Sequence, residues 1–195
     1  MNDSALLVMD VQRGIVERFG DDDAGYLGRL ASAISTARAA GIPVVYVTIS
    51  FRPGHPEISP ANPTFAGVAA AGRFVTGDPA TEIHPAVAPH EQDVVVIKRR
   101  VSAFAGSDLD VVLRSLGAGT LVLTGIATSG VVLSTLRQAA DLDYGLTVLA
   151  DGCLDADPDV HQILLGKVFP RQAEVTTIAA WADRLHPEAP GADDR

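Results

Sequence analysis

Residues 5–10 read Ala-Leu-Leu-Val-Met-Asp, five consecutive apolar residues closed by a carboxylate. An unbroken apolar run of this length is typical of a strand that is buried on both faces of a parallel sheet. Five later segments are rich in β-branched residues and have a similar form, although the last is weaker: 44–49, 94–97, 121–124, 146–150 and 174–177. The sequence therefore predicts six strands.

Helical patterns separate these strands. Apolar side chains recur at helical spacing over about 26–40, from about 107 and over 132–140. A last helix is predicted after Asp157-Pro158, because proline suits the first turn of a helix. A regular alternation of strand and helix favours a parallel sheet with helices on both faces. We therefore predict an α/β fold: a single three-layer α/β/α, Rossmann-like domain around a doubly wound, mainly parallel six-stranded sheet.

The chain has 195 residues, of which 47% are hydrophobic, and its formal net charge is −9. This length and apolar fraction suit one globular domain with a sizeable core. The acidic balance argues against nucleic acid as a partner, and no apolar run is long enough to span a membrane. The N-terminus has no basic segment before its apolar run, so we expect no signal peptide and a cytoplasmic location.

Residues 50–93 form a connection far longer than the few residues that usually join neighbouring elements. The segment holds seven prolines, but also Phe51, Phe65 and Phe74, so we expect an ordered excursion that serves as a pocket wall, a lid or a subunit contact. Residues 1–186 are assigned to the domain. Residues 187–195 are rich in Pro, Gly and Asp and are predicted to be a disordered acidic tail.

Polar residues follow the carboxyl ends of the predicted strands, where ligands of open α/β sheets bind. Asp10 ends the first apolar run, Lys98 ends the third, and the loop 125–131 follows the fourth. A carboxylate and an ammonium at neighbouring strand ends can act as an acid/base pair. Strands also end on charges because solvent begins there, and Asp10 could simply cap a turn. The three features together favour a catalytic site.

Three segments of the chain resemble the isochorismatase-like hydrolases, also called the cysteine hydrolases. They read LLVMDVQ over 6–12, KRRVSAFAGSDL over 98–109 and LTGIAT over 123–128, and Ser-Thr follows at 134–135. The resemblance extends from about residue 5 to about residue 177, with the motifs in the order that the family has. It implies the three-layer fold and a hydrolase activity.

The resemblance also implies roles for individual residues. Asp10 matches the acid/base aspartate of the family, and Lys98 matches its active-site lysine. Ile126 and Ala127 match the place of a cis peptide bond. The loop that they begin runs through Gly130, and in the family it presents backbone N–H groups as an oxyanion hole.

The sequence departs from the family at the nucleophile. Amidase members carry a nucleophilic cysteine six residues after the loop glycine, and in this chain that position, the last of the oxyanion loop, is Val131. Valine has no lone pair, so it cannot form a thioester. The single cysteine, Cys153, follows the fifth predicted strand. It is expected to be a small buried hydrophobe, or alternatively a thiol at the edge of the pocket.

No metal site or cofactor is predicted. Nicotinamidase members of the family carry an aspartate and two histidines after the second strand, whereas the segment 50–56 of this chain holds one histidine, His55. A single cysteine also excludes an intramolecular disulfide and a multi-thiolate zinc site.

Polar and aromatic residues after the strand ends are the predicted substrate contacts: Gln12, Phe51, Arg52, Arg100 and Phe104. Arg52 and Arg100 are the predicted partners of a substrate carboxylate, because a guanidinium binds a carboxylate with two parallel hydrogen bonds. The predicted partner is a small-molecule substrate. The excursion over 50–93 is apolar enough to support a homodimer or a higher homo-oligomer.

Three functions remain open. In the first, the protein hydrolyses a small carboxylated compound by non-covalent acid/base chemistry, as isochorismatases without the cysteine do to a vinyl ether, with Asp10 and Lys98. In the second, it is a catalytically degenerate family member that binds a small molecule or a protein. In the third, it is an amidase-type hydrolase in which Cys153 or water replaces the missing nucleophile.

Overall fold

The computed structural model describes residues 3–19 and 25–185 and contains a six-stranded sheet. The strands are β1 (Ser4–Met9), β2 (Val44–Ile49), β3 (Val94–Lys98), β4 (Thr120–Ile126), β5 (Gly145–Leu154) and β6 (Glu174–Thr176). They lie in the order β3-β2-β1-β4-β5-β6, and every neighbouring pair is parallel. This is a doubly wound order, so the predicted fold class is confirmed. The predicted tail, 187–195, lies outside the described residues.

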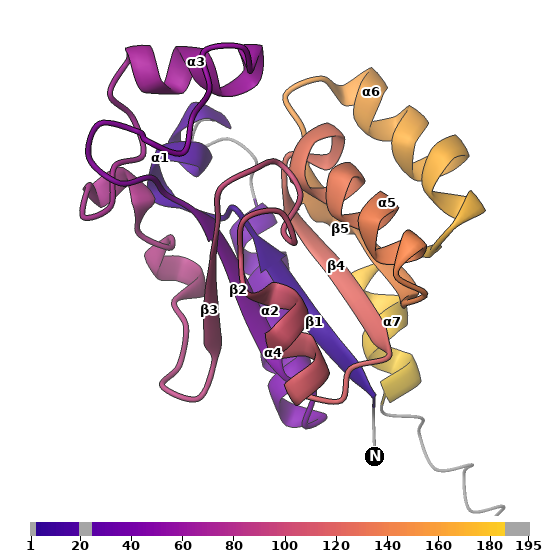
Figure 1. The fold of residues 1–195 in the computed structure, drawn as a ribbon. Helices are drawn as coiled ribbons and strands as arrows, with labels where there is room; N and C mark the ends of the chain where they lie inside the picture. Colours follow the sequence, from indigo (N-terminus) through magenta and orange to yellow (C-terminus); the bar gives the residue numbers. More distant parts are fainter. Residues whose placement is uncertain (1–2, 20–24, 186–195) are drawn as a thin grey trace, which may run out of the picture.

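Two layers of helices cover the sheet. One layer contains α4 (Leu109–Ser115), α5 (Leu133–Asp141) and α6 (Pro158–Ile163), and the other contains α2 (Tyr26–Ala39) and α7 (Ile178–Leu185). In Figure 1, α4 and α5 lie in front of the sheet, and α2 and α7 lie behind it. Leu7 and Met9 of β1 pack with the first layer, whereas Leu6 and Val8 pack with the second. Both faces of β1 are therefore buried, which explains its unbroken apolar run.

β5 is longer than the sequence predicts. Its apolar run ends at Asp151, but the strand continues to Leu154. The charge is tolerated because the Asp151 carboxylate accepts a hydrogen bond of 2.8 Å from the backbone N–H of Ile178, the first residue of α7. The helix α7 itself is not among the predicted elements. Its local signal is Thr177, whose hydroxyl accepts a hydrogen bond from the N–H of Ala180.

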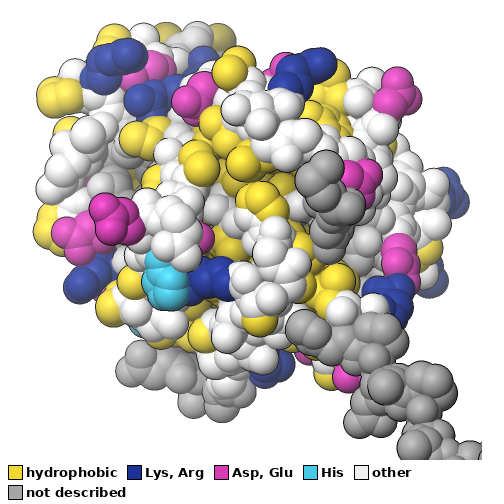
Figure 2. Space-filling view, turned by 90° about the horizontal axis from the view of Figure 1, so that it is seen from below, with side chains coloured by type: hydrophobic (Ala, Val, Ile, Leu, Met, Phe, Trp, Pro, Cys, Tyr) yellow, Lys and Arg dark blue, Asp and Glu magenta, His cyan; other side chains and the backbone are white. Residues whose placement is uncertain are grey.

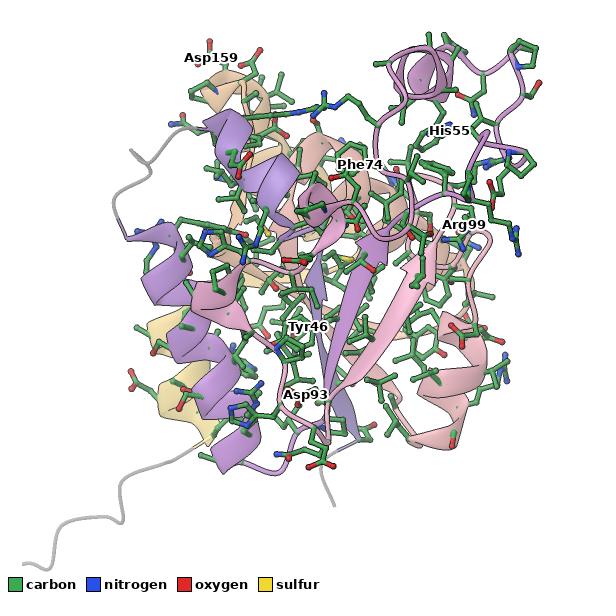
Figure 3. All side chains as sticks on the ribbon, turned by 90° about the vertical axis from the view of Figure 1, so that its left-hand side faces the viewer. Tyr46, His55, Phe74, Asp93, Arg99 and Asp159 are labelled. Carbon is green, nitrogen blue, oxygen red and sulfur yellow. The ribbon has the colours of Figure 1, made fainter. Side chains whose placement is uncertain are left out.

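Residues 50–93 fold over the carboxyl ends of the strands. They contain α3 (Pro63–Ala70) and two short 3₁₀ helices (Pro79–Thr81 and Pro85–Val87). In Figure 1, α3 lies at the top of the molecule near α1 (Arg13–Val16), and Figure 3 shows Phe74 above the ends of the strands. Phe51, Phe65 and Phe74 pack with Ile49 in a separate apolar cluster. The excursion is thus an ordered cover on the end of the sheet where ligands are expected.

The opposite end of the molecule carries charges of both signs. Figure 2 looks at this end, and the described Lys, Arg, Asp and Glu side chains there are interspersed with hydrophobic ones. Within residues 3–19 and 25–185, no helix is both long enough and apolar enough to cross a membrane.

Candidate active site

Asp10 and Lys98 form a buried ion pair at the carboxyl end of the sheet. Asp10 directly follows β1, Lys98 is the last residue of β3, and Lys98 Nζ lies 2.9 Å from Asp10 Oδ2. Lys98 also donates a hydrogen bond of 2.9 Å to the carbonyl oxygen of Arg100. Asp10 Oδ1 is buried and has no hydrogen-bond partner among residues 3–19 and 25–185. One oxygen of the carboxylate is therefore available to a ligand.

The two residues do not come from neighbouring strands. β2 lies between β1 and β3, and Lys98 pairs in register with Ile49 of β2. From the sequence, we expect the third strand to lie close to the first if Asp10 and Lys98 converge. The two residues do converge, but one strand, β2, separates β3 from β1. The long side chain of Lys98 extends past β2 to reach the carboxylate.

Burial controls the acidity of Asp10. Removal from water raises the pKa of the Asp10 carboxyl, and the opposing attraction of the Lys98 ammonium is the smaller effect. Its backbone is also unusual, with a φ of 59° in the left-handed region. Such conformations of residues other than glycine are uncommon and cluster at functional sites. A carboxyl with a raised pKa can donate a proton at a pH at which an exposed aspartate cannot.

Gly125 brings the loop after β4 against β1. Its φ is 141°, and a Cβ atom at this position would lie 2.2 Å from the carbonyl oxygen of Met9. The peptide bond between Ile126 and Ala127 is cis, as the resemblance implies. Residues Thr128–Val132 then form a π-helical turn that leads into α5.

The backbone of this loop is partly occupied by its own hydrogen bonds. The N–H of Gly130 donates to the carbonyl oxygen of Ala127 at 3.0 Å, and the N–H of Ser129 donates to the carboxylate of Asp155. These two N–H groups are therefore not free to bind an oxyanion. The predicted contribution of Gly130 is corrected accordingly: it lines the cavity, but its N–H is already paired.

A cavity of about 400 Å³ opens beside the ion pair. Its wall includes six of the predicted site residues: Asp10, Lys98, Ile126, Ala127, Gly130 and Val131. Val131, the residue that the resemblance places at the position of the nucleophile, also lines this cavity. These residues were predicted from their places after the carboxyl ends of strands and from the family resemblance, and the tertiary structure brings them to one cavity.

Three predicted substrate contacts lie elsewhere. The side-chain amide of Gln12 is hydrogen-bonded to the backbone N–H and carbonyl of Ile49 and to the carbonyl of Thr81, so it ties β1 to β2 and the excursion. Phe51 is fully buried in the aromatic cluster of the excursion. Phe104 packs in the apolar layer beneath α4 and α5. Their hydrogen bonds and packing are those of structural residues, and none of the three lines the cavity.

The two predicted carboxylate partners are already paired. The Arg52 side chain is 68% exposed and forms a 2.8 Å ion pair with Glu57. Arg100 donates hydrogen bonds to the carbonyl oxygens of Arg99 and Glu57. Both guanidiniums therefore bind Glu57 of the excursion, one at its carboxylate and the other at its carbonyl, and neither lines the cavity.

Other residues line the cavity without having been predicted as substrate contacts. Arg18 lies eight residues after Asp10, and Phe65 and Phe74 come from the excursion. The aromatic content of the excursion indicates an ordered segment, but only the folded chain places these rings at the cavity. Arg18 belongs to the segment that follows β1. A search for ligand-binding residues over more of the chain after each strand end would therefore have found it.

Cys153 is a core residue. It lies within β5, the residue is 4% exposed, and it packs in the apolar layer on the side of α4 and α5. Burial raises the pKa of the Cys153 thiol to about 12, which strongly disfavours the nucleophilic thiolate. Cys153 is not among the residues that line the cavity.

Histidine contacts in the described part of the chain are structural. His55 Nε2 lies 2.7 Å from the carbonyl oxygen of Arg73, and His161 Nδ1 lies 2.8 Å from the hydroxyl of Thr128. Among residues 3–19 and 25–185, no three His, Cys, Asp or Glu side chains are grouped as ligands of a metal ion would be.

Comparison with known proteins supports the resemblance. The isochorismatase domain model matches residues 4–180. The ureidoacrylate amidohydrolase RutB of Methylobacterium radiotolerans is 33% identical over 202 residues, which cover 92% of this chain and 78% of that protein. A cysteine hydrolase from Pseudomonas syringae pv. phaseolicola superposes with a TM-score of 0.86 at 26% identity, over 95% of this chain and 94% of that chain.

A second solved structure, the N-carbamoylsarcosine amidase from Thermoplasma acidophilum, superposes with a TM-score of 0.75 at 28% identity, over 91% of this chain and 97% of that chain. These similarities extend over nearly the whole domain, including both strand ends that carry the ion pair. The chain therefore belongs to the isochorismatase family.

Proposed function

We propose that this isochorismatase-family hydrolase acts on a small carboxylated compound by non-covalent acid/base chemistry. The observation that carries the proposal is the buried Asp10–Lys98 pair, which faces a cavity whose wall holds Val131 at the position of the family's nucleophile. The side chains that line the cavity include a carboxyl and an ammonium for proton transfer, but no thiol.

Hydrolysis of a vinyl ether fits these groups. A protonated Asp10 donates its proton to the terminal vinyl carbon, and the resulting oxocarbenium ion adds water. The proton released by that water returns to the Asp10 carboxylate, and the hemiketal breaks down to a ketone and an alcohol. A raised pKa supports this role, because Asp10 must carry the proton before the substrate reacts.

An amidase reaction is the second candidate. It is favoured by the relatives named ureidoacrylate amidohydrolase and N-carbamoylsarcosine amidase. Because Cys153 does not line the cavity, water would be the nucleophile, and an ionised Asp10 would accept its proton. The two reactions therefore need opposite protonation states of Asp10. The third possibility, a protein that only binds a ligand, does not depend on the protonation state of Asp10 for catalysis.

A turnover panel that contains isochorismate and small amides tests the proposal. We expect turnover of vinyl ethers that bear a carboxylate and none of simple amides. Hydrolysis of amides alone would favour the second candidate, and turnover of no member of the panel would favour a binding module.

The pH dependence separates the mechanisms. We expect kcat/KM to fall as the pH rises through the raised pKa of Asp10, because the proton donor is lost. A Cys153 thiolate mechanism would show the reverse, since a thiol with a pKa of about 12 ionises only in alkaline solution. The measurement is kcat/KM from about pH 3 to about pH 10, a range that spans the ordinary pKa values of both groups. A rise of kcat/KM towards alkaline pH would contradict the acid role.

The Cys153→Ala variant is expected to keep the turnover rate of the unmodified protein, because the thiol lies outside the cavity. Native protein should also react slowly with iodoacetamide near neutral pH, since burial disfavours the thiolate. The chain has one cysteine, so the same assay in denaturant measures full reactivity and serves as the control. Loss of turnover in a folded Cys153→Ala protein would support the cysteine mechanism instead.

A further inference from the structure

We propose that Arg18 binds the carboxylate of the substrate, and that Arg73, which contacts the same Phe74 ring as Arg18, strengthens this binding. The inference rests on the proposed function in one respect: it takes the cavity beside Asp10 and Lys98 as the place where the substrate reacts. It assigns the anion-binding role to a different pair of arginines from those that the sequence indicates.

Arg18 and Phe74 line the same cavity as the ion pair. The guanidinium carbon of Arg18 lies 5.8 Å from the centroid of the Phe74 ring, and that of Arg73 lies 5.3 Å from it. Both distances are within the range of cation–π contacts. One aromatic ring therefore holds two cations near the cavity.

Both arginines are exposed to solvent, and their charges have no ionic partner within the described residues. Neither the Arg18 nor the Arg73 side chain has an ion pair or hydrogen bond within residues 3–19 and 25–185, whereas Arg13, Arg38 and Arg52 each pair with a carboxylate. Inside the cavity, Lys98 and Asp10 balance each other, which leaves Arg18 as the remaining charged lining group. In a chain of net charge −9, the described lining of the cavity therefore has a positive balance.

Repulsion between the two arginines supports the assignment. The small buried part of the otherwise exposed Arg18 side chain, followed by the charge of Arg73, lowers the pKa of Arg18. A bound anion would relieve both costs, because it supplies a counter-charge and hydrogen-bond acceptors where few exist. A guanidinium suits a carboxylate in particular, since its planar N–H groups can bind both oxygens.

The backbone holds Phe74 and Arg73 in place before any ligand binds. Phe74 has a φ of 56°, which is unusual for a bulky side chain, and its carbonyl accepts a 2.8 Å hydrogen bond from the N–H of Phe51. The carbonyl oxygen of Arg73 lies 2.7 Å from His55 Nε2. Figure 3 shows His55 and Phe74 in the excursion above the strand ends. The anion site is thus carried on an ordered wall of the cavity.

A carboxylate bound by Arg18 would leave Asp10 and Lys98 to act on another part of the same small molecule. The site would then select an anionic compound over its neutral counterpart of the same shape. This selection can be measured without turnover, so its outcome does not depend on which reaction the protein catalyses.

Binding of benzoate and of benzamide tests the inference, because the two differ in charge but hardly in shape. We expect titration calorimetry at low ionic strength to give benzoate an affinity about tenfold higher than benzamide, as for a hydrogen-bonded charged group. Arg18→Gln should abolish that preference, and Arg73→Gln should weaken it. Arg13→Gln is the matched control in the same helical segment, where the side chain pairs with Glu82, and it should leave the preference unchanged.

Two results would overturn the inference. One is the absence of a preference for benzoate in the unmodified protein, and the other is a preference that survives in a folded Arg18→Gln variant, which would point to Lys98 as the anion partner. A failure of the proposed function gives a different result: the Asp10→Asn variant would retain turnover, whether or not the protein prefers benzoate to benzamide. In kinetics with a carboxylated substrate, Arg18→Gln should raise KM more than it lowers kcat, because it removes a binding contact.

Discussion

Asp10→Asn lowers the turnover of a carboxylated vinyl ether by about 10²–10⁴-fold, which is the expected contribution of a general acid. The asparagine side chain has nearly the same shape as the protonated aspartate and fits the same buried place beside Lys98. It has no acidic proton to give, however. The measurement is kcat and kcat/KM on the best substrate of the panel. A rate equal to that of the unmodified protein would exclude Asp10 as the acid.

The control for this variant must also break a buried ion pair. Asp10→Asn leaves the Lys98 ammonium buried without its partner, which destabilises a fold by about 3–5 kcal/mol in other buried pairs. Asp93→Asn is a suitable match, because Asp93 is an aspartate with a mostly buried side chain that pairs with Arg38 at the other end of the sheet, where Figure 3 shows it. We expect Asp93→Asn to lose stability in urea but to keep its turnover. Equal loss of turnover in both variants would indicate a stability effect alone.

Gly125→Ala should destabilise the fold by roughly 2–5 kcal/mol, from the combined costs of overpacking and of a left-handed backbone with a Cβ atom. The new Cβ would lie 2.2 Å from the carbonyl oxygen of Met9 and 2.9 Å from its Cβ. β1 and β4 are paired centrally in the sheet, so neither can move away without loss of its neighbour. Since a single domain is stable by only about 5–15 kcal/mol, the variant would be marginal or unfolded. Urea denaturation followed by circular dichroism measures the effect.

Gly41→Ala separates the two costs. Gly41 also has a positive φ, 68°, but a Cβ atom there would meet nothing within 4 Å. We expect only the backbone cost, about 1–2 kcal/mol. If both variants lost equal stability, the close approach of Gly125 to Met9 would not be the reason for the glycine.

The chain's own cysteine illustrates how composition and position differ. One cysteine is compatible with a thiol enzyme, but Cys153 lies inside a strand of the core, where burial raises its pKa to about 12. The residue at the end of the cavity loop, Val131, carries no reactive group. The proposed chemistry therefore depends on Asp10 rather than on the residue that gives the cysteine hydrolases their name.

The strands and the ion pair were accessible from the sequence. A strand buried on both faces, such as β1, needs an apolar residue at each position, so the run that ends at Asp10 is visible without coordinates. The run that ends at Lys98 is apolar as well, although β3 is an edge strand in which Val95 and Ile97 are exposed. In a parallel sheet the carboxyl ends of strands meet at one edge, which is why two strand-end charges could be expected near each other. The strand order and the extra length of β5 depend on partners distant in the sequence, such as Ile178 for Asp151.

The choice among the arginines was decided only by the tertiary structure. Arg18, Arg52, Arg73 and Arg100 have the same charge and all lie in segments near strand ends or in the excursion. Glu57 pairs with Arg52 and accepts a hydrogen bond from Arg100, whereas Arg18 and Arg73 meet at the ring of Phe74 beside the cavity. Local patterns determine which residues are apolar or charged, and hence the layers of the fold. The neutralisation of a charge depends on which carboxylate the folded chain brings within a few ångströms, because the attraction between two charges depends on the distance between them and on the solvent around them.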